Sequence, residues 1–126
     1  MTKNLPVKNC QFNLKPGSSD ENWFVFDLET NGLYDDVTKI FCIVIYDVTR
    51  KQTFTYGPDV IDDAIKHLNT AHTLIGHNII FYDIPVLRKI TDFQLQAHVI
   101  DTLVCTRFIW PKEKLFELDD NKAFNN

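Results

Sequence analysis

The segment WFVFDLETNGL, residues 23–33, decides the fold of this chain. Its first part is an almost unbroken apolar run, which is typical of a central strand that is buried on both faces. An Asn-Gly pair follows and predicts a turn. Asp27 and Glu29 are two residues apart, so on a strand both side chains point to the same face. The segment therefore predicts a strand that carries paired carboxylates to one edge of a sheet.

The elements after this strand are ordered as in an α/β fold. Residues 39–46 and 52–56 are β-rich runs with a short link, which favours a hairpin. Apolar runs and helical periodicity then predict strands at 73–76 and 97–100 and helices at 59–68, at 82–90 and from 101 towards Pro111. The order β-β-β-α-β-α-β-α indicates a five-stranded mixed sheet with flanking helices.

Length and composition indicate one soluble domain. The chain has 126 residues, which suits a single core. We expect a polar lead-in at residues 1–21, the domain at 22–111 and a charged tail at 112–126. No apolar stretch approaches the roughly 20 residues that cross a membrane, and no signal peptide is recognised. We expect a cytoplasmic protein whose three cysteines (Cys10, Cys42 and Cys105) are buried free thiols.

The charge balance narrows the class of function. A net charge of −4 excludes a protein that holds nucleic acid by bulk positive charge. It leaves room for a metal-dependent nuclease, because bound cations bring the positive charge that a phosphate needs. Five basic residues are candidates for lining the path of a DNA strand, although solvated surface charge is the default interpretation: Lys39, Lys66, Arg88, Lys89 and Arg107.

A second polar group lies in LIGHNIIFYDIPVL, residues 74–87. A short buried strand leads to Asn78, and Asp83 follows five residues later where a helix begins. Asp83 is either a metal-binding carboxylate or an ordinary helix cap. Carboxylate oxygens suit Mg²⁺ or Mn²⁺ rather than zinc. Neither this segment nor an isolated Asp-x-Glu is specific by itself.

Together, VFDLETNGL, LIGHNIIFYDIPVL and VIDTLVCTRF resemble the DEDD (DnaQ-like) 3′–5′ exonuclease superfamily. The resemblance runs from about Trp23 to Trp110 and is strongest to the proofreading domain of family A DNA polymerases, closest to those of short-tailed bacteriophages. It implies a ribonuclease-H-like fold and hydrolysis of 3′-terminal phosphodiesters with two Mg²⁺ or Mn²⁺ ions. The implied substrate is a single-stranded or frayed DNA 3′ end, and a phage-encoded protein would act in the host cell cytoplasm.

The resemblance also assigns roles to single residues. It makes Asp27, Glu29 and Asp83 the catalytic, metal-binding carboxylates. Five further positions fall where the family contacts or shapes the site for the terminal nucleotide: Thr30, Leu33, Asn78, Phe81 and Tyr82. Leu33 would wedge against a base, whereas Phe81 and Tyr82 would either stack on a base or pack in the core.

The third motif of the family is not recognised in this sequence. It is a Tyr-x-x-x-Asp, or a His with wider spacing, on a helix after the last strand, and no such spacing follows Asp101. Asp101 itself is expected to cap the final helix. We therefore expect an incomplete domain that lacks the C-terminal helix of the family.

Several alternatives follow from this departure. A second polypeptide would carry the third motif and the polymerase domain, or the chain would self-associate through an apolar face near residues 108–110. Otherwise the chain is a non-catalytic binding remnant or a weak exonuclease by itself. Whether this chain alone is an enzyme, and whether RNA replaces DNA as substrate, stay open.

Overall fold

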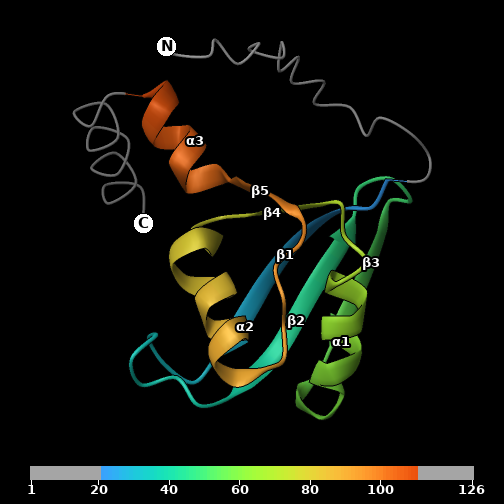
Figure 1. Cartoon of the computed structure of the whole chain (residues 1–126), viewed down its shortest axis with the longest axis vertical. Coiled ribbons are helices and arrows are strands. Elements are labelled where there is room, and N and C mark those ends of the chain that lie inside the picture. Colours follow the sequence, from blue (N-terminus) through green and yellow to red (C-terminus); the bar gives the residue numbers. More distant parts are fainter. Residues whose placement is uncertain (1–20, 111–126) are drawn as a thin grey trace, which may run out of the picture.

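The computed structural model describes residues 21–110, which form one sheet with helices packed against it (Figure 1). The strands are β1 (Trp23–Thr30), β2 (Ile40–Asp47), β3 (Gln52–Tyr56), β4 (Thr73–Gly76) and β5 (His98–Asp101). The α-helices are α1 (Ile61–Leu68), α2 (Ile84–Ile90) and α3 (Thr102–Ile109). Two short turns precede α1 and α2, a 3-10 turn η1 (Pro58–Val60) and a π-helical turn η2 (Ile79–Asp83). The predicted tail and almost all of the predicted lead-in lie outside the described residues.

The sheet is five-stranded and mixed, with the order β3-β2-β1-β4-β5. β1 pairs antiparallel with β2 and parallel with β4, so it lies at the centre of the sheet. β2 and β3 form the predicted hairpin, and β4 pairs parallel with β5. The predicted α/β class and the five-stranded mixed sheet with flanking helices are thus confirmed.

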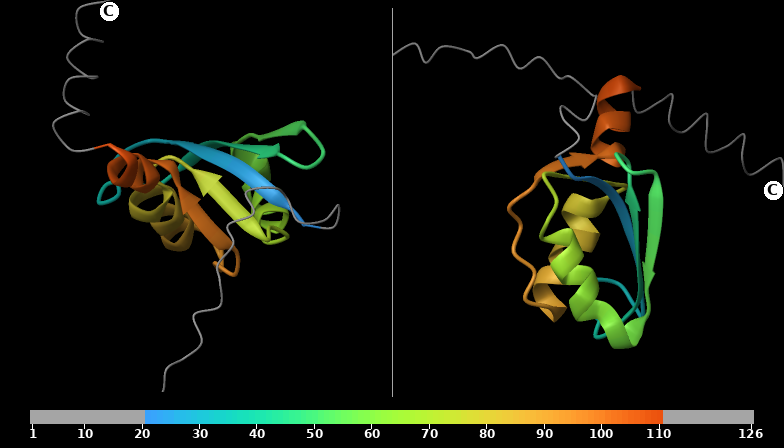
Figure 2. Two further views of the ribbon diagram at one scale, coloured as in Figure 1. Left: turned by 90° about the horizontal axis from the view of Figure 1, so that it is seen from above. Right: turned by 90° about the vertical axis from the view of Figure 1, so that its right-hand side faces the viewer.

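One face of the sheet carries the core, and α1 and α2 both lie on that side (Figure 2). Along β1 the side chains of Phe24, Phe26 and Leu28 are buried, whereas Asp27 and Glu29 are exposed. The prediction that β1 is buried on both faces is therefore wrong. The apolar run misled because Val25, an apolar residue within it, lies on the open face and is 37% exposed.

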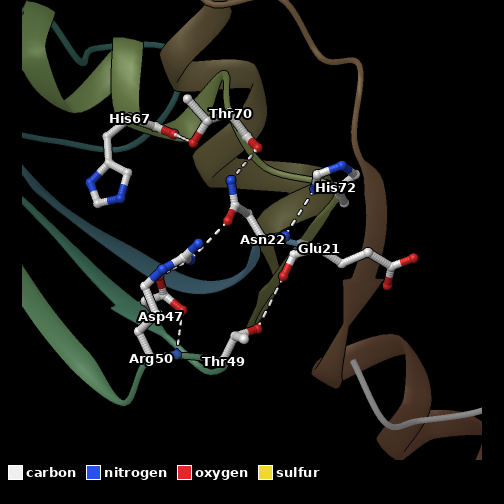
Figure 3. A network of polar contacts seen from close by, with 8 residues as sticks. All are labelled: Glu21, Asn22, Asp47, Thr49, Arg50, His67, Thr70 and His72. Atoms are coloured by element: carbon white, nitrogen blue, oxygen red, sulfur yellow. Dashed lines mark hydrogen bonds and ion pairs between the residues drawn. The ribbon is translucent and has the colours of Figure 1, made fainter. Parts of the chain in front are cut away.

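The start of β1 is fixed by a network of hydrogen bonds to two neighbouring loops (Figure 3). The Asn22 N–H donates to His72 Nδ1 at 2.9 Å, and its side-chain amide donates to the Thr70 carbonyl at 3.0 Å. Arg50 Nη1 donates to Asn22 Oδ1 and to buried Asp47, both at 2.9 Å. Burial alone would raise the pKa of Asp47, but hydrogen bonds and charge from Arg50 hold it below its usual value. The network anchors β1 at the end away from its carboxylates.

Two further features of the described residues concern the length of the helices and the burial of the cysteines. No helix in residues 21–110 is long and apolar enough to span a membrane. The prediction of buried thiols is wrong for Cys105, which is exposed, and Cys42 is only half-buried. Cys105 is exposed because α3 buries none of its residues. Cys10 lies outside the described residues.

Candidate active site

The carboxylates of β1 lie where the strand loses its regular pairing. Asp27 pairs with Val44 and Glu29 with Cys42, and the register then shifts between Glu29 and Thr30. Because Asp27 and Glu29 alternate with buried residues, both side chains project from the open face of the sheet. The predicted same-face placement of the two carboxylates is confirmed.

Asp83 approaches the same strand from η2. Its carboxylate is buried, at 3% exposure, and Oδ1 accepts a hydrogen bond from the Leu28 N–H at 3.2 Å. Asp83 occupies the N-cap position of α2, yet its side chain makes no capping hydrogen bond. The interpretation of Asp83 as an ordinary helix cap is therefore wrong. The π-helical turn directs the side chain to β1 instead, and such turns recur at functional sites.

The charges of Asp83 and Asp27 interact, and this interaction affects the pKa of Asp83. Burial and, to a smaller extent, the negative charge of Asp27 raise the pKa of Asp83 to about 6, while the Leu28 N–H opposes the shift. Asp101 adds a smaller repulsion. Two carboxylates that repel each other in this way favour a cation between them.

Asp101 sets the position of η2. Its carboxylate accepts hydrogen bonds from the N–H groups of Asn78 at 2.9 Å and Ile80 at 3.0 Å. It also accepts from the Leu103 N–H at 2.9 Å, which confirms the predicted cap of the last helix. Its second role, at the start of η2, was not predicted, because it depends on β5 lying beside β4. Asn78 turns the chain between them with a left-handed backbone, at a φ of 59°.

Asp101→Asn is expected to lower the free energy of unfolding by about 1–2 kcal/mol at pH 7, since a neutral amide serves four backbone N–H groups less well. Burial would raise the pKa of Asp101, but these N–H groups hold it below its usual value. Ionised Asp101 therefore stabilises the fold above the pKa that this carboxyl has in the unfolded chain. This stabilisation is lost as the pH falls through the lower pKa of the folded protein. Urea unfolding at pH 7 and in strong acid, with exposed Asp92→Asn as control, tests this. An equal loss at both pH values would contradict it.

The residues predicted to contact substrate lie in different environments. Leu33 and Phe81 are 78% and 69% exposed. Tyr82 is half-buried against the core, and its hydroxyl lies 2.5 Å from both Thr30 Oγ1 and the Gly32 carbonyl. Of the two predicted stacking residues, Phe81 is thus the one whose ring is available to a ligand.

The fit to divalent cations is partial within the described residues. Residues 21–110 contain no group of three or more His, Cys, Asp or Glu that could hold a metal ion, so Glu29 does not complete a cluster with Asp27 and Asp83. The coupled pair Asp27 and Asp83 nevertheless offers the hard oxygen ligands that Mg²⁺ and Mn²⁺ take, and Mg²⁺ often keeps several water ligands. These two carboxylates therefore fit an ion whose other ligands are water, and they supply only part of a coordination shell.

Comparison with known proteins shows which family the chain belongs to. The DNA-directed DNA polymerases of Escherichia phage T7 and Enterobacteria phage T3 are each 33% identical over 96 residues, which cover 68% of this chain and 14% of each polymerase. The family B DNA polymerase from the archaeon Pyrobaculum calidifontis aligns with a TM-score of 0.42 and 12% identity, over 55% of this chain and 10% of that chain, too distant a likeness to carry weight. A model of the RNase_H superfamily matches residues 24–117. The chain therefore belongs to the RNase_H superfamily and is related to phage DNA polymerases through a short part of their length.

Proposed function

We propose that this chain is a metal-dependent 3′–5′ exonuclease module of a phage-type DNA polymerase that proofreads single-stranded or frayed DNA ends. The observation that carries the proposal is Asp83, which is buried beside Asp27 and directed at β1 rather than at its own helix. Burying a carboxylate next to another costs stability unless a cation offsets the repulsion. A purely structural position would not need this charge.

The proposed division of roles follows from the placement of each residue. Asp27 and Asp83 would hold divalent ions, with Glu29 available on the exposed side of β1. Such ions would supply an activated water and would neutralise charge on the phosphate. The Leu28 N–H fixes the orientation of Asp83. Exposed Leu33 and Phe81, on the segments that follow Asp27 and precede Asp83, are suited to contact the terminal bases.

The open face of the sheet supports a second part of the proposal. Among residues 21–110 no helix covers the side of β1 that carries Asp27 and Glu29, and Tyr46 on that side is 38% exposed. We propose that the third-motif carboxylate and its tyrosine or histidine reach this face from outside residues 21–110. A second polypeptide with the polymerase domain, or a second copy of the chain, would supply them. Exposed Phe108, at 87%, is consistent with a partner on α3.

The test is digestion of a 5′-labelled single-stranded DNA with Mg²⁺ or Mn²⁺ by the purified chain, alone and together with a polypeptide that carries the polymerase domain. Where the site is completed, we expect a ladder that shortens from the 3′ end, and we expect EDTA or Asp27→Ala to abolish it. Asp59→Ala, which removes an exposed acid on η1, is the matched control and should cleave normally. Cleavage that persists in EDTA or in Asp27→Ala would overturn the proposal.

A non-catalytic binding module is the second candidate, favoured by the lack of a three-carboxylate cluster in residues 21–110. In that case the same DNA would bind in a Mn²⁺-dependent manner without being cut, and Asp27→Ala would weaken the binding. An RNA of the same sequence, run in parallel, distinguishes the two nucleic acids as substrate.

A further inference from the structure

We propose that Tyr82 and Lys89 form a two-point clamp that holds the loop of residues 31–39 against η2 and α2. The clamp fixes Leu33 in the orientation that receives the 3′-terminal nucleotide. That Leu33 receives a nucleotide depends on the proposed function. The clamp itself is argued only from contacts among the described residues. Both are positioning residues, because each acts through the loop rather than on the reacting atoms.

The loop is a closed unit with Leu33 at its exposed turn. Asn31 Oδ1 accepts hydrogen bonds from the N–H groups of Thr38 and Lys39, both at 3.0 Å, and thereby joins the two ends of the loop. The Leu33 carbonyl accepts from the N–H groups of Asp36 at 3.0 Å and Val37 at 2.8 Å. These bonds fix the shape of the loop but not its orientation relative to α2. Val37 is buried in the core and holds the later part of the loop, so further contacts must orient the exposed turn that carries Leu33.

Tyr82 supplies the first contact. Its hydroxyl lies 2.5 Å from Thr30 Oγ1 and donates to the Gly32 carbonyl at 2.5 Å, and Thr30 Oγ1 itself donates to the same carbonyl at 3.0 Å. The hydroxyl thus binds the chain directly before Leu33. Because the ring packs against the core, the hydroxyl has little freedom to move.

Lys89 supplies the second contact, on the other side of Leu33. Its Nζ donates to the carbonyls of Tyr34 at 2.7 Å and Asp35 at 3.1 Å, and it lies 5.1 Å from the centroid of the Tyr34 ring. Two of its three N–H groups are therefore engaged within the protein. Lys89 is better explained as a support of the loop than as part of a basic strip along DNA.

The two contacts connect the loop to the element that carries Asp83. Tyr82 precedes Asp83 directly in η2, and Lys89 lies on α2, which continues from it. The segment that orients the buried carboxylate therefore also orients Leu33. Because η2 and α2 hold both Asp83 and the loop, this one segment sets the distance between the terminal nucleotide and the carboxylates.

The test measures loop order and DNA binding separately. Amide hydrogen exchange at Asp36 and Val37 reports on the loop without any ligand. Binding of a 3′ end is followed by the fluorescence of a single-stranded DNA that ends in 2-aminopurine, with a terminal phosphorothioate to prevent cleavage, in Mn²⁺. The variants are Lys89→Gln, Tyr82→Phe and the conservative Lys89→Arg. Lys51→Gln is the control, since Lys51 is an exposed lysine in the turn between β2 and β3 and is not one of the candidates for lining a DNA strand.

We expect Lys89→Gln and Tyr82→Phe to accelerate exchange at both amides and to raise the Kd for the 2-aminopurine DNA about five-fold each. Lys89→Arg should retain most of the binding, and Lys51→Gln should match the wild type. The Kd for Mn²⁺ alone should not change, because Asp83 keeps its bond from Leu28. The Kd of the double variant should rise by less than the product of the two single increases. The two contacts hold the same loop, so the loss of one already weakens the other.

Three results would decide against the inference or part of it. Unchanged exchange in both variants overturns the clamp. Faster exchange with an unchanged Kd overturns its role in placing the 3′ end. A wild-type chain that does not bind the DNA, while exchange still responds to the variants, overturns the proposed function but leaves the clamp standing.

Discussion

Asp83→Asn is expected to stabilise the metal-free protein at pH 8 by about 3 kcal/mol, as each pKa unit corresponds to about 1.4 kcal/mol. The wild-type carboxylate has a pKa of about 6, above its ordinary value of 3.8, because it is buried and is repelled by Asp27. Folding therefore disfavours the ionised form, and stability is lost as the pH rises through the folded pKa. Asparagine keeps the acceptor for the Leu28 N–H and carries no charge.

Urea unfolding in EDTA across pH 4–8 measures this effect. The two proteins should be equally stable at pH 4, where Asp83 is protonated in the wild type, and should diverge as the pH rises. Asp27→Asn should give part of the same gain, and the double variant should gain less than the sum, because the two carboxylates interact. A constant difference across the range would show that Asp83 does not titrate as described.

Asp83→Asn is expected to change stability and activity in opposite directions. Mn²⁺ should stabilise the wild type and leave Asp83→Asn unaffected, because the variant has lost a carboxylate ligand. Any metal-dependent cleavage should fall at least about a hundred-fold, as expected when several kcal/mol of charge stabilisation are removed. A variant that is more stable yet still cleaves at the wild-type rate would remove Asp83 from the proposed site.

Gly76→Ala is expected to destabilise the fold by about 3 kcal/mol, the upper range for overpacking a core. A Cβ at this position would lie 2.3 Å from Ile79 Cγ2 and 3.0 Å from the Phe26 carbonyl oxygen. Ile79 is fully buried and β-branched, and the carbonyl belongs to the central strand, so neither neighbour can move freely. Relief of the contact would displace η2 and, with it, Asp83.

Thermal and urea unfolding of Gly76→Ala, beside Gly57→Ala, test this prediction. Gly57 is the matched control, because a Cβ there meets nothing within 4 Å. Ile79→Ala, combined with Gly76→Ala, should recover part of the loss because it removes the nearer obstacle. Equal stability of the two glycine variants would show that the close approach of β4 and η2 is not required.

The sequence alone determined most of the secondary-structure elements and the placement of Asp27 and Glu29 on the same face of their strand. The strands at 52–56 and 73–76 were predicted with the observed bounds, and those at 39–46 and 97–100 are each displaced by one residue. Local periodicity suffices here because it depends only on which neighbours are apolar. The alternation along β1 likewise placed Asp27 and Glu29 on one face before any contact was known.

Only the tertiary structure decided which face of the sheet is open and how distant residues serve the site. Asp83 binds the N–H of Leu28, 55 residues earlier, and Asp101 binds Asn78 across the pairing of β4 with β5. Lys89 reaches a loop more than fifty residues away. The sequence shows the chemistry of each side chain but not where it points in the fold. Here that is fixed by the parallel pairing of β4 with β5 and by the π-helical turn η2. The sequence by itself therefore determined the carboxylates and their strands, whereas long-range packing decided which of them meet.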